Sequence, residues 1–350
     1  MNRPAHSAME WPVGGKMDKV STCRAAYLIP FLDVLRDIGA PVDRELERAH
    51  LPTMVEEKPD DLISIFLAME YLDRSARREG IDDLGWHWVK RFSASDFSAE
   101  LLVALQALPT VKARLDCLSN LIALEDSDTR VGLIGFNGSA EVYCDSKSPE
   151  IPSDPISEWT QVTVLIEAVR SITGENWSPD EIRFKSDFSV CDDARNANPN
   201  TRFLTQSAHT SIIMPSSVLA ASKLTSAAAQ VPEPNIHETL DGLENLKRLI
   251  RPYLRGGTPK MIMFAEILDV RPRSLQRKLQ QAGTSFSDLI ETTRFEMAAE
   301  LLAESDAPLI DVAMTLGYEN QSNFGRSFRR VAGISPGRYR RKVIGREHVA

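Results

Sequence analysis

Two stretches near the end of the chain decide how that part folds: SLQRKLQQAGTSFSDLIETTRFEMAAELL, residues 274–302, and IDVAMTLGYENQSNFGRSFRRVAGISPGRYR, residues 310–340. Their apolar residues recur every three or four positions, as in amphipathic helices. Pro272 stands at the start of one such pattern, and Gly283 and Gly317 end two of them, as the terminal preferences of helices lead one to expect. The patterns predict helices at about 240–253, 260–268, 272–281, 286–303, 308–316, 320–331 and 335–342.

The predicted helices 260–268 and 272–281 are joined by a tight turn and form a helix-turn-helix pattern. Leu275 and Leu279 are one helical turn apart, so both can dock on the first helix of the pair. The opposite face then carries side chains of the types that read guanine and adenine edges in the major groove of DNA. These residues are Arg273, Gln276 and Arg277.

A second pair of helices, 308–316 and 320–331, repeats this layout. Phe324 and Phe328 point inward, and the residues that face outward near the helix start are Gln321, Ser322, Asn323 and Arg326. Four arginines beyond them are candidates for contacts with the DNA backbone: Arg329, Arg330, Arg340 and Arg341. The simplest alternative for Arg273, Arg277 and Arg326 is an ordinary solvated helix face.

Six short patterns follow one another here in the order and spacing of one family: LQR-x-L, G-x-SF, R-x-x-x-A-x-x-L, VA-x-x-LGY, S-x-F-x-R-x-F and G-x-SP-x-x-YR. The fourth has Val312-Ala313 where the family has Ile-Ala. Over about 80 residues the chain resembles the DNA-binding domain of AraC/XylS transcriptional regulators. The resemblance implies an all-α domain with two helix-turn-helix units joined by a long helix, and it gives the outward-facing residues of both units the base-reading role.

The long helix 286–303 limits how the domain can lie on DNA. It spans about 27 Å, whereas adjacent major-groove faces repeat every ~34 Å. We therefore expect a modest bend of the DNA toward the protein. For Arg294 on this helix, a buried ion pair that ties the helix to the rest of the domain is favoured over a phosphate contact.

Charge is distributed unevenly along the chain. Residues 240–350 carry 18 Lys and Arg against 13 Asp and Glu, whereas the other 239 residues carry 23 basic and 36 acidic side chains. The excess of basic residues at the C-terminal end indicates that this end meets a polyanion.

The region before residue 222 predicts an α/β fold that begins with helices. Helical patterns cover 27–38, 44–49 and 61–79, and a further helix is expected from Trp159 to Thr173. The runs 130–138 and 140–145 read as strands joined at Asn137-Gly138, a strong hairpin signal. Further short strands are expected in the runs EIRFKSDF, RFLTQ and TSIIMP.

This N-terminal region also resembles a family module. The segments DDLISIFLAMEYL, DLGWHWVKRF and RFLTQSAHTSIIMPSSVL are similar to the arabinose-binding-like sensor segment of ornithine-utilisation and VirS-like regulators. The resemblance implies that this half senses a small-molecule effector or pairs two protomers. Control by a partner protein, a purely structural role and an enzyme fused to the DNA-binding domain are the alternatives. The enzyme is the least favoured, because no nucleophile–base pair, Gly-rich phosphate loop or metal spacing is present.

No residue of the sensor region can be assigned to an effector. Trp86, His87 and Trp88 could line a pocket, although packing is the favoured role. Arg74 and Arg78 are one turn apart and could clamp a phosphate, although a solvated face with a Glu70–Arg74 pair is favoured.

The domain boundaries follow from composition. We expect a disordered tail at 1–22, with Met17 a candidate start, a sensing and dimerisation domain at 23–221, a linker at 222–238 and the DNA-binding domain at 239–345. Four dispersed cysteines are expected to be reduced thiols, and neither a metal nor a cofactor is predicted. With no signal peptide or membrane span, the expected protein is a cytoplasmic regulator.

The resemblance implies that the protein binds double-stranded DNA, pairs as a homodimer and activates rather than represses transcription, in which case RNA polymerase is a partner. An architectural or partner-controlled DNA binder without an effector is the alternative.

Overall fold

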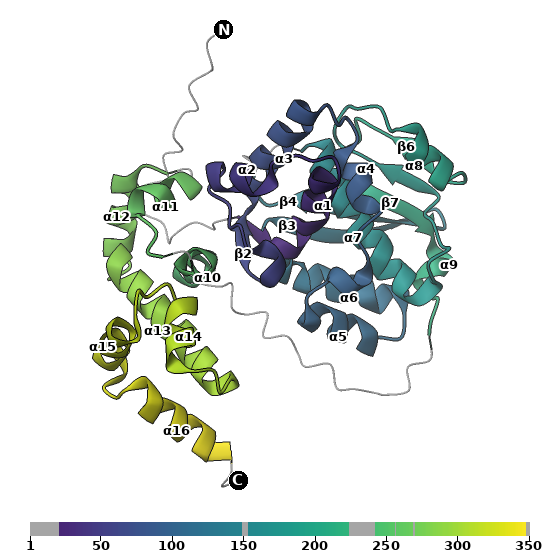
Figure 1. Ribbon diagram of the computed structural model, residues 1–350. Helices are drawn as coiled ribbons and strands as arrows, with labels where there is room; N and C mark the ends of the chain where they lie inside the picture. Colours follow the sequence, from purple (N-terminus) through teal and green to yellow (C-terminus); the bar gives the residue numbers. More distant parts are fainter. Residues whose placement is uncertain (1–20, 149–152, 224–241, 256, 269, 348–350) are drawn as a thin grey trace. The chain divides into compact units, whose positions relative to one another are not determined.

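The computed structural model describes residues 21–148, 153–223, 242–255, 257–268 and 270–347. They divide into two compact units, one within Ser21–Thr239 and one within Leu240–Ala350 (Figure 1). The first unit is α/β with a helical entry segment and the second is all-α, which confirms the predicted fold classes. No helix among the described residues is long and apolar enough to cross a membrane.

Most of the predicted tail and linker lies outside the described residues. Thr22, which we placed in the tail, is buried and begins a strand. At the other end, Ser222 pairs with Thr110 in an isolated bridge, and the Lys223 amide donates to the Pro109 carbonyl at 2.9 Å. The first unit therefore includes the residues that begin the predicted linker.

The helical entry segment contains a two-stranded sheet that the sequence did not predict. Strand β2 (Leu62–Ser64) pairs antiparallel with β1 (Thr22–Arg24), and helix α3 (Ile65–Glu79) begins only after it. The predicted helix 61–79 was therefore wrong at its start. Ser64 ends the strand and caps the helix, because its hydroxyl accepts from the Leu67 amide at 3.4 Å. The other elements of the segment are η1 (Ala25–Tyr27), α1 (Ile29–Asp37), α2 (Val42–Arg48), η2 (Val55–Glu57), α4 (Leu84–Val89), η3 (Ala94–Asp96), α5 (Ala99–Ala107), α6 (Val111–Leu121) and η4 (Ile122–Leu124).

A five-stranded sheet with the order β3-β4-β7-β5-β6 forms the rest of the first unit. Its strands are β3 (Thr129–Phe136), β4 (Ser139–Ser146), β5 (Glu181–Arg183), β6 (Arg202–Leu204) and β7 (Thr210–Pro215), with α8 (Asp192–Ala197) and α9 (Ser216–Leu219) between or after them. All neighbouring strands are antiparallel except β5 and β6. The predicted hairpin is confirmed at Asn137-Gly138, where φ is +45° and +81°. Both values suit a type I′ turn.

Helix α7 (Pro155–Thr173) connects the two parts of this unit, because it packs on β4 and β7 of the sheet and on α4 and α6 of the helical segment. It begins four residues earlier than predicted. Asp154 caps it by accepting from the amides of Ile156 and Ser157, at 2.9 and 3.1 Å, and Pro155 occupies the first position. The inward face of α7 is apolar and includes Val162, Leu165 and Val169.

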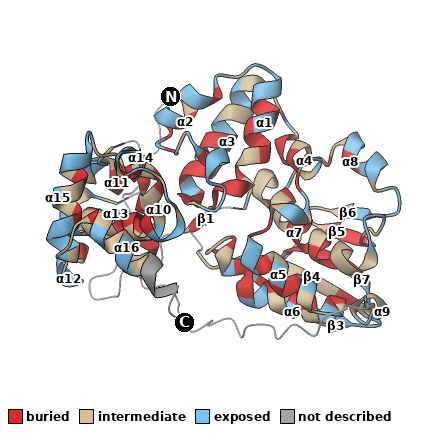
Figure 2. Cartoon of the chain, turned by 60° about the horizontal axis from the view of Figure 1, so that its bottom comes forward, coloured by how far each residue is buried: buried red, intermediate tan, exposed pale blue. Residues whose placement is uncertain are grey.

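The second unit consists of seven described helices: α10 (Gly242–Leu254), α11 (Met261–Ile267), α12 (Pro272–Gln281), α13 (Phe286–Glu304), α14 (Leu309–Thr315), α15 (Gln321–Ala332) and α16 (Pro336–Glu347). The long helix α13 packs against α10, α14, α15 and α16. In Figures 1 and 2, α12 and α15 lie on the same side of α13. The two helix-turn-helix units are α11–α12 and α14–α15, as the sequence predicts.

Candidate nucleic-acid interface and sensor cavity

The first helix-turn-helix unit presents the polar face that the sequence predicts. Leu275 and Leu279 of α12 are buried, together with Phe264 of α11, and they fix which side of α12 faces the domain. The opposite side is exposed, as the burial colours in Figure 2 show for α12. The exposed residues there include Arg273, Gln276 and Arg277.

In the second unit, Phe324 and Phe328 are buried and orient α15 in the same way. Gln321, Ser322 and Arg326 are exposed, whereas Asn323 is half-buried. Arg326 donates to the Asn323 side-chain oxygen at 2.7 Å, so these two candidate base readers hold each other in place. A base that engages either one must compete with this bond or use its remaining donors.

Asn320 is a positioning residue that the sequence analysis missed. Its side-chain oxygen accepts from the Asn323 amide at 2.9 Å and so caps the start of α15. The signal was present, because Asn is a preferred capping residue and stands directly before the predicted outward face. Tyr318 adds a second anchor, since its hydroxyl lies 3.0 Å from the Ser327 hydroxyl.

The four arginines predicted to contact the DNA backbone differ in their surroundings. Arg329 and Arg341 are exposed. Arg330 pairs with Glu291 of α13 at 2.6 Å, and Arg340 donates to the Ala307 carbonyl at 2.7 Å. Arg330 therefore joins α15 to α13, and Arg340 joins α16 to the segment between α13 and α14, which leaves part of each guanidinium for other contacts.

Arg294 joins three segments of the domain, but not through the expected ion pair. Its guanidinium donates to the Gly257 carbonyl and to the Thr258 hydroxyl, both at 2.9 Å, and lies over the Tyr318 ring at 5.0 Å from the centroid. These are neutral partners, so the ion-pair prediction was wrong while the structural role holds. Arg294 connects the long helix α13 with the loop after α10 and with the turn before α15.

A protein family described as a helix-turn-helix domain matches residues 264–342. This region is an AraC-type helix-turn-helix domain. Over 97 residues the chain is 40% identical to the HTH-type transcriptional regulator VirS of Mycobacterium tuberculosis, which covers 28% of each protein. Over 105 residues it is 34% identical to the ornithine utilization regulator of Pseudomonas aeruginosa, which covers 29% of this chain and 31% of that one.

The chain thus aligns with less than a third of the length of these relatives. Among solved structures, the transcriptional regulator CdpR from Pseudomonas aeruginosa is similar, with 18% identity and a TM-score of 0.36 over 90% of this chain and 98% of that one.

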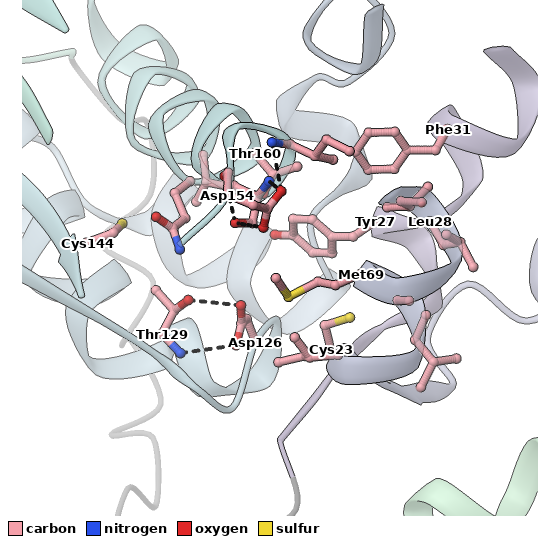
Figure 3. A pocket seen from close by; sticks show the side chains of 18 of the residues that line it. Cys23, Tyr27, Leu28, Phe31, Met69, Asp126, Thr129, Cys144, Asp154 and Thr160 are labelled. Atoms are coloured by element: carbon pink, nitrogen blue, oxygen red, sulfur yellow. Dashed lines mark hydrogen bonds between the residues drawn. The ribbon is translucent and has the colours of Figure 1, made fainter. Parts of the chain in front are cut away.

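The N-terminal unit contains a cavity of about 100 Å³ that lies outside the AraC-type domain. One wall comes from the helical entry segment and includes Tyr27, Phe31 and Met69, and the other comes from β3, β4 and α7 (Figure 3). The lining is mainly apolar, with polar side chains concentrated on the second wall. Those polar residues include Asp126, Thr129, Asp154, Ser157, Thr160 and Gln161.

Two carboxyl groups in this lining are already held by hydrogen bonds. Asp126 accepts from the amides of Asp128 and Thr129 at 2.8 and 3.0 Å, and from the Thr129 hydroxyl at 2.9 Å. Asp154 accepts from the Ser157 hydroxyl at 2.6 Å besides capping α7. Burial raises the pKa of both Asp126 and Asp154 above the ordinary value, although these hydrogen bonds oppose the shift.

The Tyr27 hydroxyl faces the same cavity. Figure 3 shows this side chain pointing into the cavity from the helical wall, toward the side where Asp154 and Asp126 lie. Its oxygen is buried and has no hydrogen bond of normal geometry among the described residues, although the Glu125 carboxylate lies near it. Burial, and then the Glu125 carboxylate, raise the pKa of Tyr27 well above its ordinary value, so the hydroxyl remains protonated at neutral pH.

The aromatic residues that the sequence singled out do not line this cavity. Trp88 is fully buried, stacks on Phe92 with ring centroids 4.3 Å apart and donates to the Tyr27 carbonyl at 2.8 Å. Trp86 packs on Trp159 at 5.2 Å. The favoured packing role is therefore the one observed.

The predicted phosphate clamp also has other partners, because Arg78 pairs with Glu45 at 3.1 Å. All four cysteines are free. No group of three or more His, Cys, Asp or Glu placed to hold a metal ion occurs in the part of the chain that the structure describes.

Proposed function

We propose that this protein is a DNA-binding transcriptional regulator whose AraC-type domain reads two adjacent major grooves and whose N-terminal unit binds a small-molecule effector. The supporting observation is that α12 and α15 lie on one side of α13, each with its apolar residues buried and with exposed Arg and Gln residues on its other face. Arginine and glutamine at the start of such helices can form paired hydrogen bonds with base edges.

In this proposal Arg273, Gln276 and Arg277 read one groove, and Gln321, Ser322, Asn323 and Arg326 read the next. The exposed Arg329 and Arg341 contact phosphates, with Arg330 and Arg340 as further candidates. Backbone contacts fix the register of the protein on DNA, and base contacts select the sequence.

The length of α13 supports a bend in the bound DNA. Its 19 residues span about 28 Å, less than the ~34 Å repeat of the major groove. Bending toward the protein brings the two groove segments closer together, so we expect a bend at the centre of the operator. A circular-permutation gel assay with the operator would measure it, and a straight complex would contradict two-groove binding by one domain.

The main test is selection of bound sequences from a random DNA pool with the wild type and with Arg277→Ala and Arg326→Ala. We expect a two-part motif, with each variant relaxing one part. Arg251→Ala is the matched control, because Arg251 lies on α10 and pairs with Glu300. If each variant binds all DNA sequences more weakly by the same factor and the selected motif is unchanged, the two arginines contact phosphates. If the wild type selects no motif, the protein is an architectural binder.

Activation and dimerisation belong to the same proposal and rest on the family resemblance. We expect the protein to bind its operator as a homodimer and to recruit RNA polymerase. Transcription from a promoter that carries the selected motif, with and without the protein, tests the sign of regulation, and sedimentation of the protein tests its oligomeric state. Reduced transcript would show that it represses.

A further inference from the structure

The N-terminal cavity has a chemical character that points to one class of ligand. We propose that it binds a small organic cation, a primary amine on a short alkyl chain, between the Tyr27 wall and the Asp126–Asp154 wall. Its regulatory meaning rests on the proposed function, because only an effector-controlled regulator would use it to change DNA binding.

The size of the cavity limits the alkyl part of the ligand. A cavity of about 150 Å³ lined by aliphatic and aromatic side chains accommodates benzene, so a cavity of about 100 Å³ holds a smaller group, such as a four-carbon chain. The residues around it are suited to such a chain, because nine of the 19 have side chains that are only hydrocarbon. They include Phe31, Ile63, Ile65, Leu72, Ile122 and Val164.

The buried Tyr27 hydroxyl indicates that the ligand carries a polar group. A buried polar atom without a hydrogen bond is costly and uncommon in folded proteins. The Tyr27 hydroxyl has no hydrogen bond of normal geometry, and the Glu125 carboxylate near it is not part of the cavity lining. The Gln161 side chain, which also lines the cavity, has no hydrogen bond among the described residues. A donor or acceptor on the ligand would pair with either group.

The charges around the cavity favour a cation as that polar group. Its described lining contains the carboxyl groups of Asp126 and Asp154 and no Lys, Arg or His. Each carboxyl group accepts three hydrogen bonds, and a carboxylate has about four acceptor sites. An anionic ligand would be buried beside two acids with no positive partner, which is strongly unfavourable. An ammonium group would donate to the free acceptor sites in charge-assisted hydrogen bonds.

Binding such a ligand would also connect the two walls. Tyr27 and Met69 belong to the helical entry segment, whereas Asp126 precedes β3 and Asp154 precedes α7. An amine that contacts both walls stabilises their arrangement relative to each other. The arrangement of the two walls would then depend on the ligand, and regulation by an effector requires such a ligand-dependent arrangement.

The test compares butylamine, 1-butanol and butanoate as probes of equal chain length. Calorimetric titration of the full chain without DNA, at millimolar probe, measures each affinity. We expect butylamine to bind about tenfold more tightly than 1-butanol, because its hydrogen bonds are charge-assisted, and butanoate not to bind. Equal affinity for the alcohol, preference for butanoate or no binding of any probe would overturn the proposal.

Two variants locate the site. Asp126→Asn removes one negative charge at constant shape, so it should weaken butylamine binding about tenfold and leave 1-butanol unchanged. Tyr27→Phe should weaken both probes. Tyr143→Phe, on β4 and outside the cavity lining, is the matched control and should change neither. If Tyr143→Phe weakens binding as much as Tyr27→Phe, the site lies elsewhere.

The DNA-binding assay is run separately on the same samples. Tight butylamine binding without any effect on operator affinity supports the cavity and contradicts effector control. Sequence-specific DNA binding without butylamine binding supports the regulator and overturns the ligand assignment.

Discussion

Gly317 is the residue of the AraC-type domain where we expect a single added methyl group to do most damage. It follows α14 with φ at +71°, a conformation that L side chains rarely adopt. A Cβ at this position would lie 2.3 Å from the Leu254 carbonyl oxygen, and 3.1 Å from backbone atoms of Gly257. These atoms belong to the backbone, which cannot rotate away as a flexible side chain can.

Gly317→Ala therefore combines two costs. The left-handed conformation costs an L residue about 1–2 kcal/mol, and forcing extra volume into a packed region costs typically about 1–3 kcal/mol. We expect the free energy of unfolding of the domain to fall by about 2–5 kcal/mol. The matched control is Gly333→Ala, because Gly333 also has φ at +71° but no atom lies within 4 Å of its added Cβ. Its expected loss is the conformational cost alone, about 1–2 kcal/mol.

Urea unfolding of the full chain can separate the two units. With Trp11→Phe as the background, the four remaining tryptophans, Trp86, Trp88, Trp159 and Trp177, all belong to the N-terminal unit, so tryptophan fluorescence reports on that unit, whereas far-ultraviolet circular dichroism reports on the helices of both. A transition seen by dichroism without a change in fluorescence belongs to the AraC-type domain. If Gly317→Ala and Gly333→Ala lower its stability equally, the close approach to Leu254 does not contribute and the reasoning is refuted.

Three further predictions concern charged groups. Arg24→Met leaves the fully buried Glu125 without its cation, 2.8 Å away, so the N-terminal unit should lose about 3–5 kcal/mol in fluorescence-detected urea unfolding; a loss below about 1 kcal/mol would contradict this. Burial raises the pKa of Asp126 above its ordinary value of 3.8. The protonated carboxyl group therefore stabilises the folded state fully at pH below 3.8, and this contribution disappears as the pH rises through the raised pKa. The stability of the wild type relative to Asp126→Asn should therefore decline with rising pH from about 4 upward, and a constant difference would show that Asp126 does not titrate this way. Arg329→Ala should reduce the salt slope of operator affinity by about 1, whereas an unchanged slope would remove it from the phosphate contacts.

The sequence predicted the AraC-type domain well because its signals are local. Helix α12 has the predicted bounds, 272–281, since proline begins it and a glycine follows its end. The buried and exposed faces of α12 and α15 follow from helical spacing alone. The partners of Arg294 were not predictable in this way, because Gly257, Thr258 and Tyr318 come from separate segments that only packing brings together.

In the N-terminal unit, the missed pairing of two strands has a non-local cause. The residues Leu62–Ser64 fit a helical pattern, yet they form a strand because Thr22–Arg24 offers a pairing partner some forty residues earlier. Such pairings override local propensity. The early start of α7 is a different case, because Asp154-Pro155 is a local capping signal that could have been recognised.

What the sequence determined by itself is the kind of domain at the C-terminal end and the residues on its outward faces, since helical periodicity and helix termini depend on neighbours a few positions away. Only the tertiary structure decided where the cavity lies and which residues line it. Tyr27 precedes Asp126 and Asp154 in the sequence by about a hundred residues or more. Each of the three residues has a local role in a helix or turn. Their meeting around one space depends on how the helical segment packs on α7 and the sheet, which no short-range pattern records.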